Sequence, residues 1–295
     1  MRPLFAVLGV QILLGVVLVV LLLSGAVPIS SDGKPGAGAA RANRFDGPAA
    51  FRLLKLQLSY GPRPAGSAAS RRLAVRLRSL MPHGRFQAVP GGLRNVVGTV
   101  PGRDPARYVV VGAHYDSKDI PGFLGANDGA GGTAALIQLA RRLRPRTIGP
   151  TVVFIAFDGE ETPRGVSEDQ FLQRGLRGSK VAAKAYRKAE AMILLDFIAD
   201  KSLSLPREGT SDPALWARTR AAAKAAGVGS YFPPTVEVSI YDDQTPFQRA
   251  GVPAINLIDW DFPCWHKTCD NLSAVSERSL DASGEAVAGL LRTLN

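Results

Sequence analysis

The sequence predicts an α/β protein with a mostly parallel mixed sheet between two layers of helices, preceded by one N-terminal transmembrane helix. Short runs of β-branched and aromatic residues, such as 108–113 and 151–157, alternate with longer stretches that are apolar at helical spacing. This alternation predicts the layered sheet. The transmembrane helix is predicted because residues 3–27 contain no charge and consist mainly of Leu and Val.

The N-terminal apolar segment, residues 1–28, is about as long as the ~20 residues that a helix needs to cross a bilayer. It exceeds the ~7–15 apolar residues of a cleaved signal peptide. We therefore expect a signal anchor, flanked by Arg2, with the remainder of the chain outside the cytoplasm. The small residues at 24–26 leave cleavage and secretion as an alternative. Residues 29–44, rich in Gly, Ala, Ser and Pro, are expected to form a flexible linker before a folded domain at 45–295.

The composition limits the classes of function. Two cysteines are too few for a disulfide-dense scaffold or a thiolate-rich zinc module. A net charge of +11 could attract nucleic acid or an anionic membrane. However, aromatic residues make up only 7 %, and none are interleaved with an arginine cluster such as 141–144. We therefore expect a solvated basic surface and no nucleic-acid partner.

The elements of the folded domain follow from periodicity and from Gly and Pro punctuation. The expected helices cover residues 46–58, 68–80, 130–143, a short stretch after 178, 213–226, 243–249 and 279–294. The expected strands cover residues 85–89, 95–100, a run ending at 114, 151–157, 191–197 and 253–258. Residues 162–177 are polar and are expected to form a surface loop. The strand–helix–strand order around residue 130 predicts a right-handed crossover between parallel strands.

Five potential metal ligands follow or end these elements. They are His114, Asp128, Glu161, Asp196 and His266. Ligands bind at the carboxyl edge of an open α/β sheet, and imidazole nitrogens with carboxylate oxygens are normal zinc ligands. Taken singly, each residue has an ordinary explanation as a core histidine, a solvated turn or a helix cap. Taken together they predict a site for one or two zinc ions, with Asp128 as the natural bridging ligand.

The strings H-Y-D-S, G-A-N-D-G-A-G-G, F-D-G-E-E, L-L-D and W-H, in this order, resemble the motifs of the M28 (aminopeptidase Y-like) zinc metallopeptidase family. The resemblance covers roughly residues 45–294, and the related glutaminyl cyclases share it. It implies the zinc-aminopeptidase fold and assigns the ligands. His114 and Asp196 would hold one zinc, Glu161 and His266 the other, and Asp128 would bridge.

The same resemblance implies roles for neighbouring residues. Glu160 would be the general base, and Asp116 would orient the imidazole of His114. The implied activity is an aminopeptidase that hydrolyses the first peptide bond of a peptide or protein with metal-activated water. A catalytically silent binding domain is a third reading, but every residue that catalysis needs is present.

Several details resemble the glutaminyl cyclases more closely. Lys118 completes the string H-Y-D-S-K, Trp265 directly precedes His266, and Asp243 lies in a segment similar to the cyclase D-D-H-x-P-F. In a cyclase, Asp243 would assist proton transfer by Glu160. Gln244 stands where that segment has histidine, and N-D-G-A-G-G is the peptidase form. We therefore expect a peptidase, with a glutaminyl-peptide cyclotransferase as the alternative.

The two cysteines, Cys264 and Cys269, flank His266. In an exported domain a disulfide between them would close a small loop around this ligand. Two reduced thiols or a thiolate ligand are the alternatives. Four aromatic residues are candidates for the walls of a substrate pocket. They are Phe171, Trp260, Phe262 and Trp265. We expect ordinary core packing for all of them except Trp265.

Overall fold

The computed structural model describes residues 42–295, and within this range the chain forms one six-stranded mixed sheet. The strand order is β1-β2-β4-β3-β5-β6. The strands are β1 (Arg85–Val89), β2 (Leu93–Val100), β3 (Asp104–His114), β4 (Pro150–Phe157), β5 (Met192–Leu195) and β6 (Ala254–Leu257). β3 pairs in parallel with β4 and β5, and β5 with β6, whereas β2 is antiparallel to β1 and β4. The mostly parallel mixed sheet predicted from the sequence is therefore confirmed.

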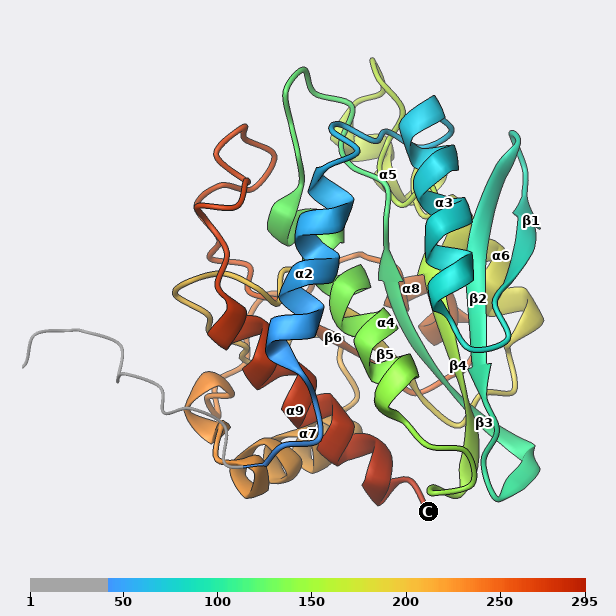
Figure 1. The fold of residues 1–295 in the computed structure, drawn as a ribbon, viewed down its shortest axis with the longest axis vertical. Coiled ribbons are helices and arrows are strands. Elements are labelled where there is room, and N and C mark those ends of the chain that lie inside the picture. Colours follow the sequence, from blue (N-terminus) through green and yellow to red (C-terminus); the bar gives the residue numbers. More distant parts are fainter. Residues whose placement is uncertain (1–41) are drawn as a thin grey trace, which may run out of the picture. The chain divides into compact units, whose positions relative to one another are not determined.

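Helices cover both faces of this sheet (Figure 1). The helices of the first face are α2 (Gly47–Leu58), α3 (Ala68–Leu80), α4 (Gly132–Arg142), α7 (Pro213–Ala226) and α9 (Glu277–Thr293). The second face is covered by α6 (Arg177–Ala185) and α8 (Gln244–Arg249). Within β3, Val109 and Val111 belong to the first core, and Val110 belongs to the second. The alternation of side chains along a strand thus explains why β3 is apolar on both faces.

Helix boundaries agree with the sequence where caps are strong. Asp46 and Ser67 cap α2 and α3 through side chains that accept from backbone N–H groups, and Asp212 does the same for α7. Three short elements were not predicted. They are the π-helical segment η1 (Ala126–Gly131), and η2 (Glu168–Gln170) with α5 (Phe171–Arg174) inside the expected loop. A further 3-10 turn, η3 (Gly229–Tyr231), follows α7.

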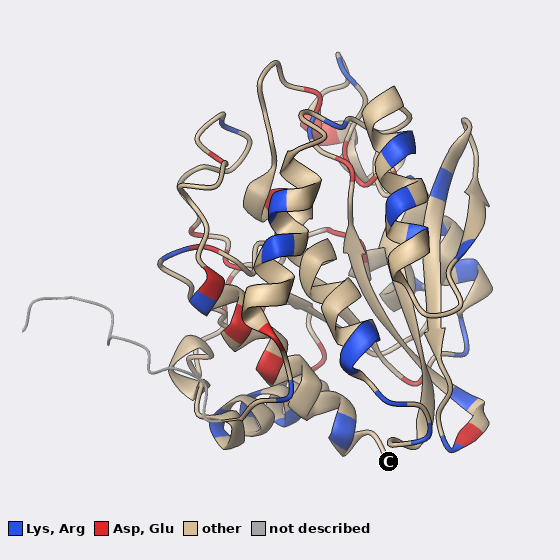
Figure 2. Ribbon diagram, viewed as in Figure 1, with Lys and Arg blue, Asp and Glu red and all other residues tan. Residues whose placement is uncertain are grey.

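The predicted anchor at residues 1–28 and linker at 29–44 fall largely outside the described residues. From residue 42 onward, no helix combines the length and the apolar character required to cross a bilayer. Figure 2 shows lysine and arginine distributed over several elements, including α3 and the C-terminal end of α4. This basic surface contrasts with the acidic site described below.

Candidate metal centre

The carboxyl ends of three adjacent parallel strands supply the first part of the site. His114 is the last residue of β3, and Asp196 directly follows β5. β4 ends at Phe157, as the sequence predicted, and a turn with Gly159 at φ +75° then delivers Glu160 and Glu161. A side chain at Gly159 would collide with Leu93 and Arg177, so glycine is required there.

Asp128 reaches the same edge through a kink in η1. Its own backbone is non-helical, and Gly129 follows with φ +88°. A Cβ at Gly129 would lie 2.7 Å from the carbonyl oxygen of Asp116 and 3.1 Å from Cε1 of His114. The kink therefore depends on glycine, and it turns the carboxylate of Asp128 toward the strand ends instead of along the helix.

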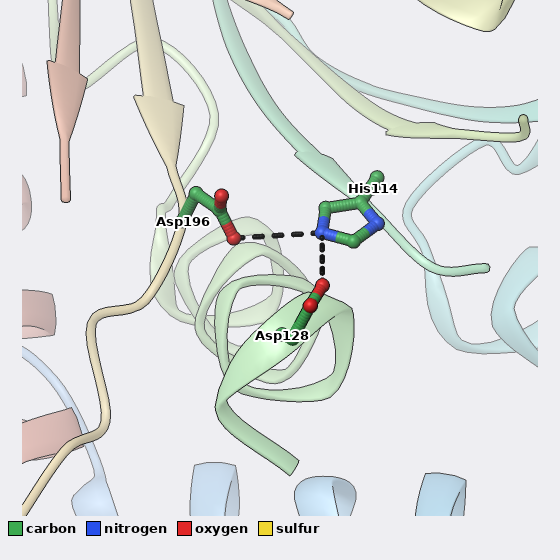
Figure 3. Close-up of side chains that lie close together, drawn as sticks. All are labelled: His114, Asp128 and Asp196. Carbon is green, nitrogen blue, oxygen red and sulfur yellow. Dashed lines mark ion pairs between the residues drawn. The ribbon is translucent and has the colours of Figure 1, made fainter. Parts of the chain in front are cut away.

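The five predicted ligands form two groups of three that share Asp128. In the first group, Nε2 of His114 lies 3.2 Å from Oδ1 of Asp128 and 3.4 Å from Oδ1 of Asp196 (Figure 3). In the second, Nε2 of His266 lies 3.6 Å from Oδ2 of Asp128 and 3.5 Å from Oε1 of Glu161. The two oxygens of Asp128 thus face different groups, as a bridging carboxylate requires.

These distances fit zinc. Zinc–nitrogen and zinc–oxygen bonds of about 2.0–2.2 Å place tetrahedral ligand atoms roughly 3.3–3.5 Å apart, which is close to all four separations. Among the described residues, both ring nitrogens of His114, Oδ2 of Asp128 and Oε1 of Glu161 are buried without a hydrogen-bond partner. Buried polar atoms without partners are costly unless an ion satisfies them. The donor set therefore suits one or two zinc ions.

Burial and charge crowding shift the pKa values of the ligands in opposite directions. Burial and then Glu161 raise the pKa of Asp128 to about 6. Burial by itself would raise the pKa of Glu161 and lower that of His266. The contact between these two groups outweighs burial, so the pKa of Glu161 is lowered and that of His266 is raised. Burial likewise lowers the pKa of His114, but its carboxylate neighbours outweigh this effect and hold it well above its usual value. These carboxylates attract positive charge, as a cation site requires.

Glu160 lies in the same cavity but not in either group of ligands. Its Oε2 is 3.9 Å from Nδ1 of His114, and burial, followed by the charge of Glu161, raises its pKa well above the usual range. Asp116 lies 3.8 Å from the same Nδ1, too far for a hydrogen bond. Its carboxylate instead accepts from the backbone N–H groups of Gly159, Glu160 and Glu161 at 3.0, 3.2 and 3.3 Å. Asp116 thus positions the two-glutamate turn.

His266 is held by a closed loop. A disulfide joins Cys264 and Cys269, with a Cα–Cα separation of 5.5 Å. His266 has a left-handed backbone with φ +50°, which a non-glycine residue adopts only when its surroundings enforce it. Its ring stacks on Trp265 with centroids 4.4 Å apart and meets Phe123 edge-on. The loop and both rings therefore fix the direction of this ligand.

Two residues that hold the shared ligand were not predicted from the sequence. Asp270, four residues beyond His266, accepts from the backbone N–H groups of Asn127 (2.8 Å) and Asp128 (3.1 Å). Burial and the charge of Asp128 raise the pKa of Asp270 to about 7. Arg63 is fully buried and donates to the carbonyl oxygens of Tyr115 and Gly125. The only sequence signal for Arg63 was its place between two prolines, and none marked Asp270.

Lys118, which was noted only as part of a motif, also touches the ligands. Its ammonium lies 3.1 Å from Oε2 of Glu161, donates to Thr162 Oγ1 at 2.6 Å and contacts Glu168. Burial lowers the pKa of Lys118, but Glu161 and Glu168 outweigh burial and raise it. Lys118 therefore stays charged and connects the second group of ligands to the loop at residues 162–176.

A cavity of about 460 Å³ opens onto the ligands. Its charged lining residues are carboxylates and the two histidine ligands. Phe171, Trp260 and Trp265 line it, so the expectation of ordinary core packing was wrong for Phe171 and Trp260. Phe262 is buried against Phe197, as expected. Asp242 lines the cavity, whereas the neighbouring Asp243 is fully buried, with its pKa raised by burial to about 7.

An α/β sheet that gathers histidine and carboxylates at the ends of its parallel strands is the architecture of a metal-dependent hydrolase or transferase. The sequence profile of peptidase family M28 matches residues 95–291, and the chain belongs to that family.

Two curated relatives represent two different chemistries. A glutaminyl-peptide cyclotransferase from Drosophila melanogaster is 29 % identical over 230 residues, which cover 63 % of this chain and 61 % of that protein. Aminopeptidase YwaD from Bacillus subtilis is 29 % identical over 196 residues, which cover 61 % of this chain and 39 % of that protein. The chain thus matches less than two thirds of the length of either relative.

Solved structures similar to this chain also include both glutaminyl cyclases and aminopeptidases. A glutaminyl cyclase from an Acidobacteriales bacterium superimposes with a TM-score of 0.74 at 27 % identity, covering 88 % of this chain and 98 % of the other. A leucine aminopeptidase precursor from Bacteroides thetaiotaomicron superimposes with a TM-score of 0.75 at 25 % identity, covering 86 % and 99 %. The zinc-exopeptidase-like fold is therefore confirmed, but it does not separate hydrolysis from cyclisation.

Proposed function

We propose that the chain is a zinc-dependent aminopeptidase, which removes the N-terminal residue of a peptide or protein. The observation that carries this proposal is the sharing of Asp128 between two groups of three ligands, with Glu160 beside them. Two cations held by one bridging carboxylate suit the addition of water to an amide, in which both the attacking and the leaving group develop charge. The family and the aminopeptidase relative support this assignment.

The residues of the chain would divide the work as follows. When bound, zinc supplies Lewis-acid activation. Glu160 takes a proton from the attacking water as the new C–O bond forms, and returns it to the amine as the C–N bond breaks. Its raised pKa makes the carboxylate a stronger base. The acidic lining of the cavity, including Asp169 and Asp242, favours the ammonium group of a substrate N-terminus.

A glutaminyl-peptide cyclotransferase is the second candidate, and the setting of Trp265 and the acids favours it. Trp265 stacks on His266 at the mouth of the cavity, while Asp242 and Asp243 pack near Glu160 and raise its pKa further. In this reaction the substrate's α-amine attacks the side-chain amide of an N-terminal glutamine. Glu160 would carry the proton from that amine to the departing ammonia. Several solved relatives with this fold are glutaminyl cyclases.

One experiment distinguishes the candidates. The full-length protein, loaded with zinc, is incubated with two peptides that differ only in an N-terminal leucine or glutamine. Release of free leucine that stops with a chelator supports the aminopeptidase, whereas ammonia and pyroglutamate from the glutamine peptide support the cyclase. Turnover of neither peptide, with zinc bound, favours the catalytically silent binding domain. Zinc stoichiometry measured on the same sample separates one ion from two.

We further propose that residues 1–28 anchor the protein in a membrane with the metal centre on the extracytoplasmic side. The uncharged run at 3–27 supports the anchor, and the disulfide between Cys264 and Cys269 suits an oxidising compartment. Protease added to intact cells should digest the domain, whereas digestion only after lysis would contradict this orientation. Recovery of the protein from the medium would support cleavage and secretion instead.

A further inference from the structure

Residues 235–241 lead from an exposed stretch of the surface into the catalytic cavity. Its last three residues, Ser239, Ile240 and Tyr241, line the cavity. Val236 and Val238 are 55 % and 58 % exposed, although valine is normally buried. We call residues 235–241 the edge segment. It places an exposed apolar surface directly beside the site where a substrate N-terminus would bind.

The edge segment pairs with residues 207–209 through an isolated bridge at Val236, and beyond this bridge Gly209 N–H donates to the Val238 carbonyl at 3.1 Å. Arg207 donates its N–H to the carbonyl of Thr235 at 3.1 Å and accepts from Glu237 N–H at 2.9 Å, which forms a parallel bridge opposite Val236. Successive residues of a strand direct their N–H and C=O groups to opposite sides. The N–H and C=O of Val236 therefore point away from Arg207, and within residues 42–295 neither has a hydrogen-bond partner.

The cavity end of the edge segment is rigidly held. The carboxylate of Glu208, 1 % exposed, accepts from Ile240 N–H at 2.8 Å and from Thr210 N–H at 2.8 Å. Gln244 donates its side-chain amide to the Ile240 carbonyl at 2.8 Å. The Val238 carbonyl and both backbone groups of Ile240 are therefore occupied, whereas Val236 offers a free N–H and C=O to another extended chain.

We propose that the edge segment binds the part of a peptide substrate that follows its N-terminal residue, by antiparallel strand addition. This proposal rests on the proposed action at a peptide N-terminus. A substrate whose N-terminus occupies the cavity at Tyr241 must run back toward Thr235, opposite to the direction of the edge segment. In an antiparallel pair, one residue exchanges both backbone hydrogen bonds with its partner, and Val236 offers both groups.

The distance along the chain from Tyr241 to Val236 determines how long a substrate must be to pair with Val236. Five residues separate Tyr241 from Val236, and an extended chain spans at most about 3.3 Å per residue, so the partner of Val236 lies up to roughly five residues beyond the substrate's first residue. The exposed side chains of Val236 and Val238 offer apolar contacts to the substrate residues that follow the first. The substrate class is therefore an extended peptide or an unfolded protein N-terminus of about six residues or more, not a free dipeptide.

The test compares peptides of two and six residues with the same N-terminal residue, using the zinc-loaded full-length protein. Two added backbone hydrogen bonds, each contributing about 0.5–1.5 kcal/mol, predict a kcat/KM roughly tenfold higher for the longer peptide. Methylation of single backbone nitrogens along the longer peptide should remove this gain at one position near the fifth or sixth residue and not elsewhere. Equal values for both peptides would overturn the proposal.

Variants address the protein side of the pair. Val236→Pro removes one free N–H and leaves the hydrogen bonds to Arg207 in place. It should reduce the ratio of kcat/KM between the six-residue and two-residue peptides to near one, with zinc stoichiometry unchanged. Val75→Ser is the matched control, because Val75 is 50 % exposed on α3 and outside the cavity lining. A ratio that survives Val236→Pro contradicts docking at this edge. A dimer that Val236→Pro dissolves would assign the edge to a second copy instead, and also overturns the proposal.

Binding separates this inference from the proposed function. In Glu160→Gln protein, which keeps every metal ligand, the longer peptide should bind roughly tenfold more tightly than the shorter one. Length-dependent binding without turnover in the unmodified protein leaves the docking edge standing and removes the proposed activity. Turnover with no dependence on length keeps the activity and removes the docking edge.

Discussion

Replacing Arg63 by methionine should destabilise the protein and weaken both metal positions at once. The buried guanidinium donates from Nε to the Tyr115 carbonyl at 3.0 Å and from Nη2 to the Gly125 carbonyl at 2.8 Å, and Nη1 contacts the Leu124 carbonyl. Methionine fills the space but donates nothing. The Gly125 carbonyl keeps the N–H of Ala130 at 3.2 Å, so two carbonyls, those of Tyr115 and Leu124, lose their donor. Each carbonyl left without a donor costs about 1–3 kcal/mol, which gives roughly 4 kcal/mol for two at the centre of that range.

A second effect opposes this loss. Burial lowers the pKa of Arg63 from 12.5 to about 10, only partly offset by Asp128, Asp270 and Asp116. A shift of this size means that the folded protein holds the charged guanidinium at a cost of about 3 kcal/mol at neutral pH, which the methionine variant escapes. The net loss is therefore about 1 kcal/mol, a fall in Tm of roughly 2–4 °C for a domain of this length.

The assay is thermal and urea unfolding, with Arg76→Met as the control because Arg76 is exposed on α3. Arg63 fixes the backbone at Leu124 and Gly125, just before the shared ligand Asp128. Zinc titration of the Arg63 variant should therefore show both affinities reduced together. A variant that is at least as stable as the unmodified protein and binds zinc normally would refute this reasoning.

Three further predictions test the site. With zinc removed by a chelator, the free energy of unfolding should fall as pH rises from about 4 to 7. The reason is that folding raises the pKa of Asp128 from 3.8 to about 6 and that of Asp270 to about 7. The raised pKa values of the two histidine ligands lower the stability in the same direction. Saturating zinc, which binds deprotonated ligands, should reverse this slope in urea titrations, and an unchanged slope would contradict the ligand assignment. Reduction of the disulfide around His266 should lower the zinc affinity of the group that contains His266 about 10–100-fold in calorimetry, which is the usual effect of losing a group that orients a ligand. The affinity of the other group should fall less, and equal effects on both would count against this role. Glu160→Gln should lower kcat by about 10²-fold or more with normal zinc content, so retained activity would remove Glu160 as the base.

The sequence predicted the strands well, and it predicted which side chains come together at their ends, because both depend on local patterns. Apolar strands that end in His114 or lead directly to Asp196 are visible in one sequence, and parallel pairing then brings their ends together. The kink at Asp128 was less visible, since a π-helical segment has no simple periodic signal.

The residues that hold the ligands could not be predicted in the same way. Arg63 and Asp270 act through backbone atoms of segments more than fifty residues away, and such contacts leave no spacing rule in the sequence. The exposed aromatic walls were misjudged for a related reason. Trp260 follows a buried strand, and only the course of the chain beyond β6 decides whether its ring packs inward or borders a cavity.

The short loop closed by Cys264 and Cys269 has a consequence for biogenesis. His266 completes the second group of ligands, and Asp270 in the adjoining turn holds the backbone of Asp128, which both groups share. A polypeptide still emerging from the ribosome or the translocation pore therefore lacks one ligand of the second position until this late loop arrives and oxidises. Full metallation therefore follows the synthesis of residues 264–270, which delays activity until the whole metal centre is present.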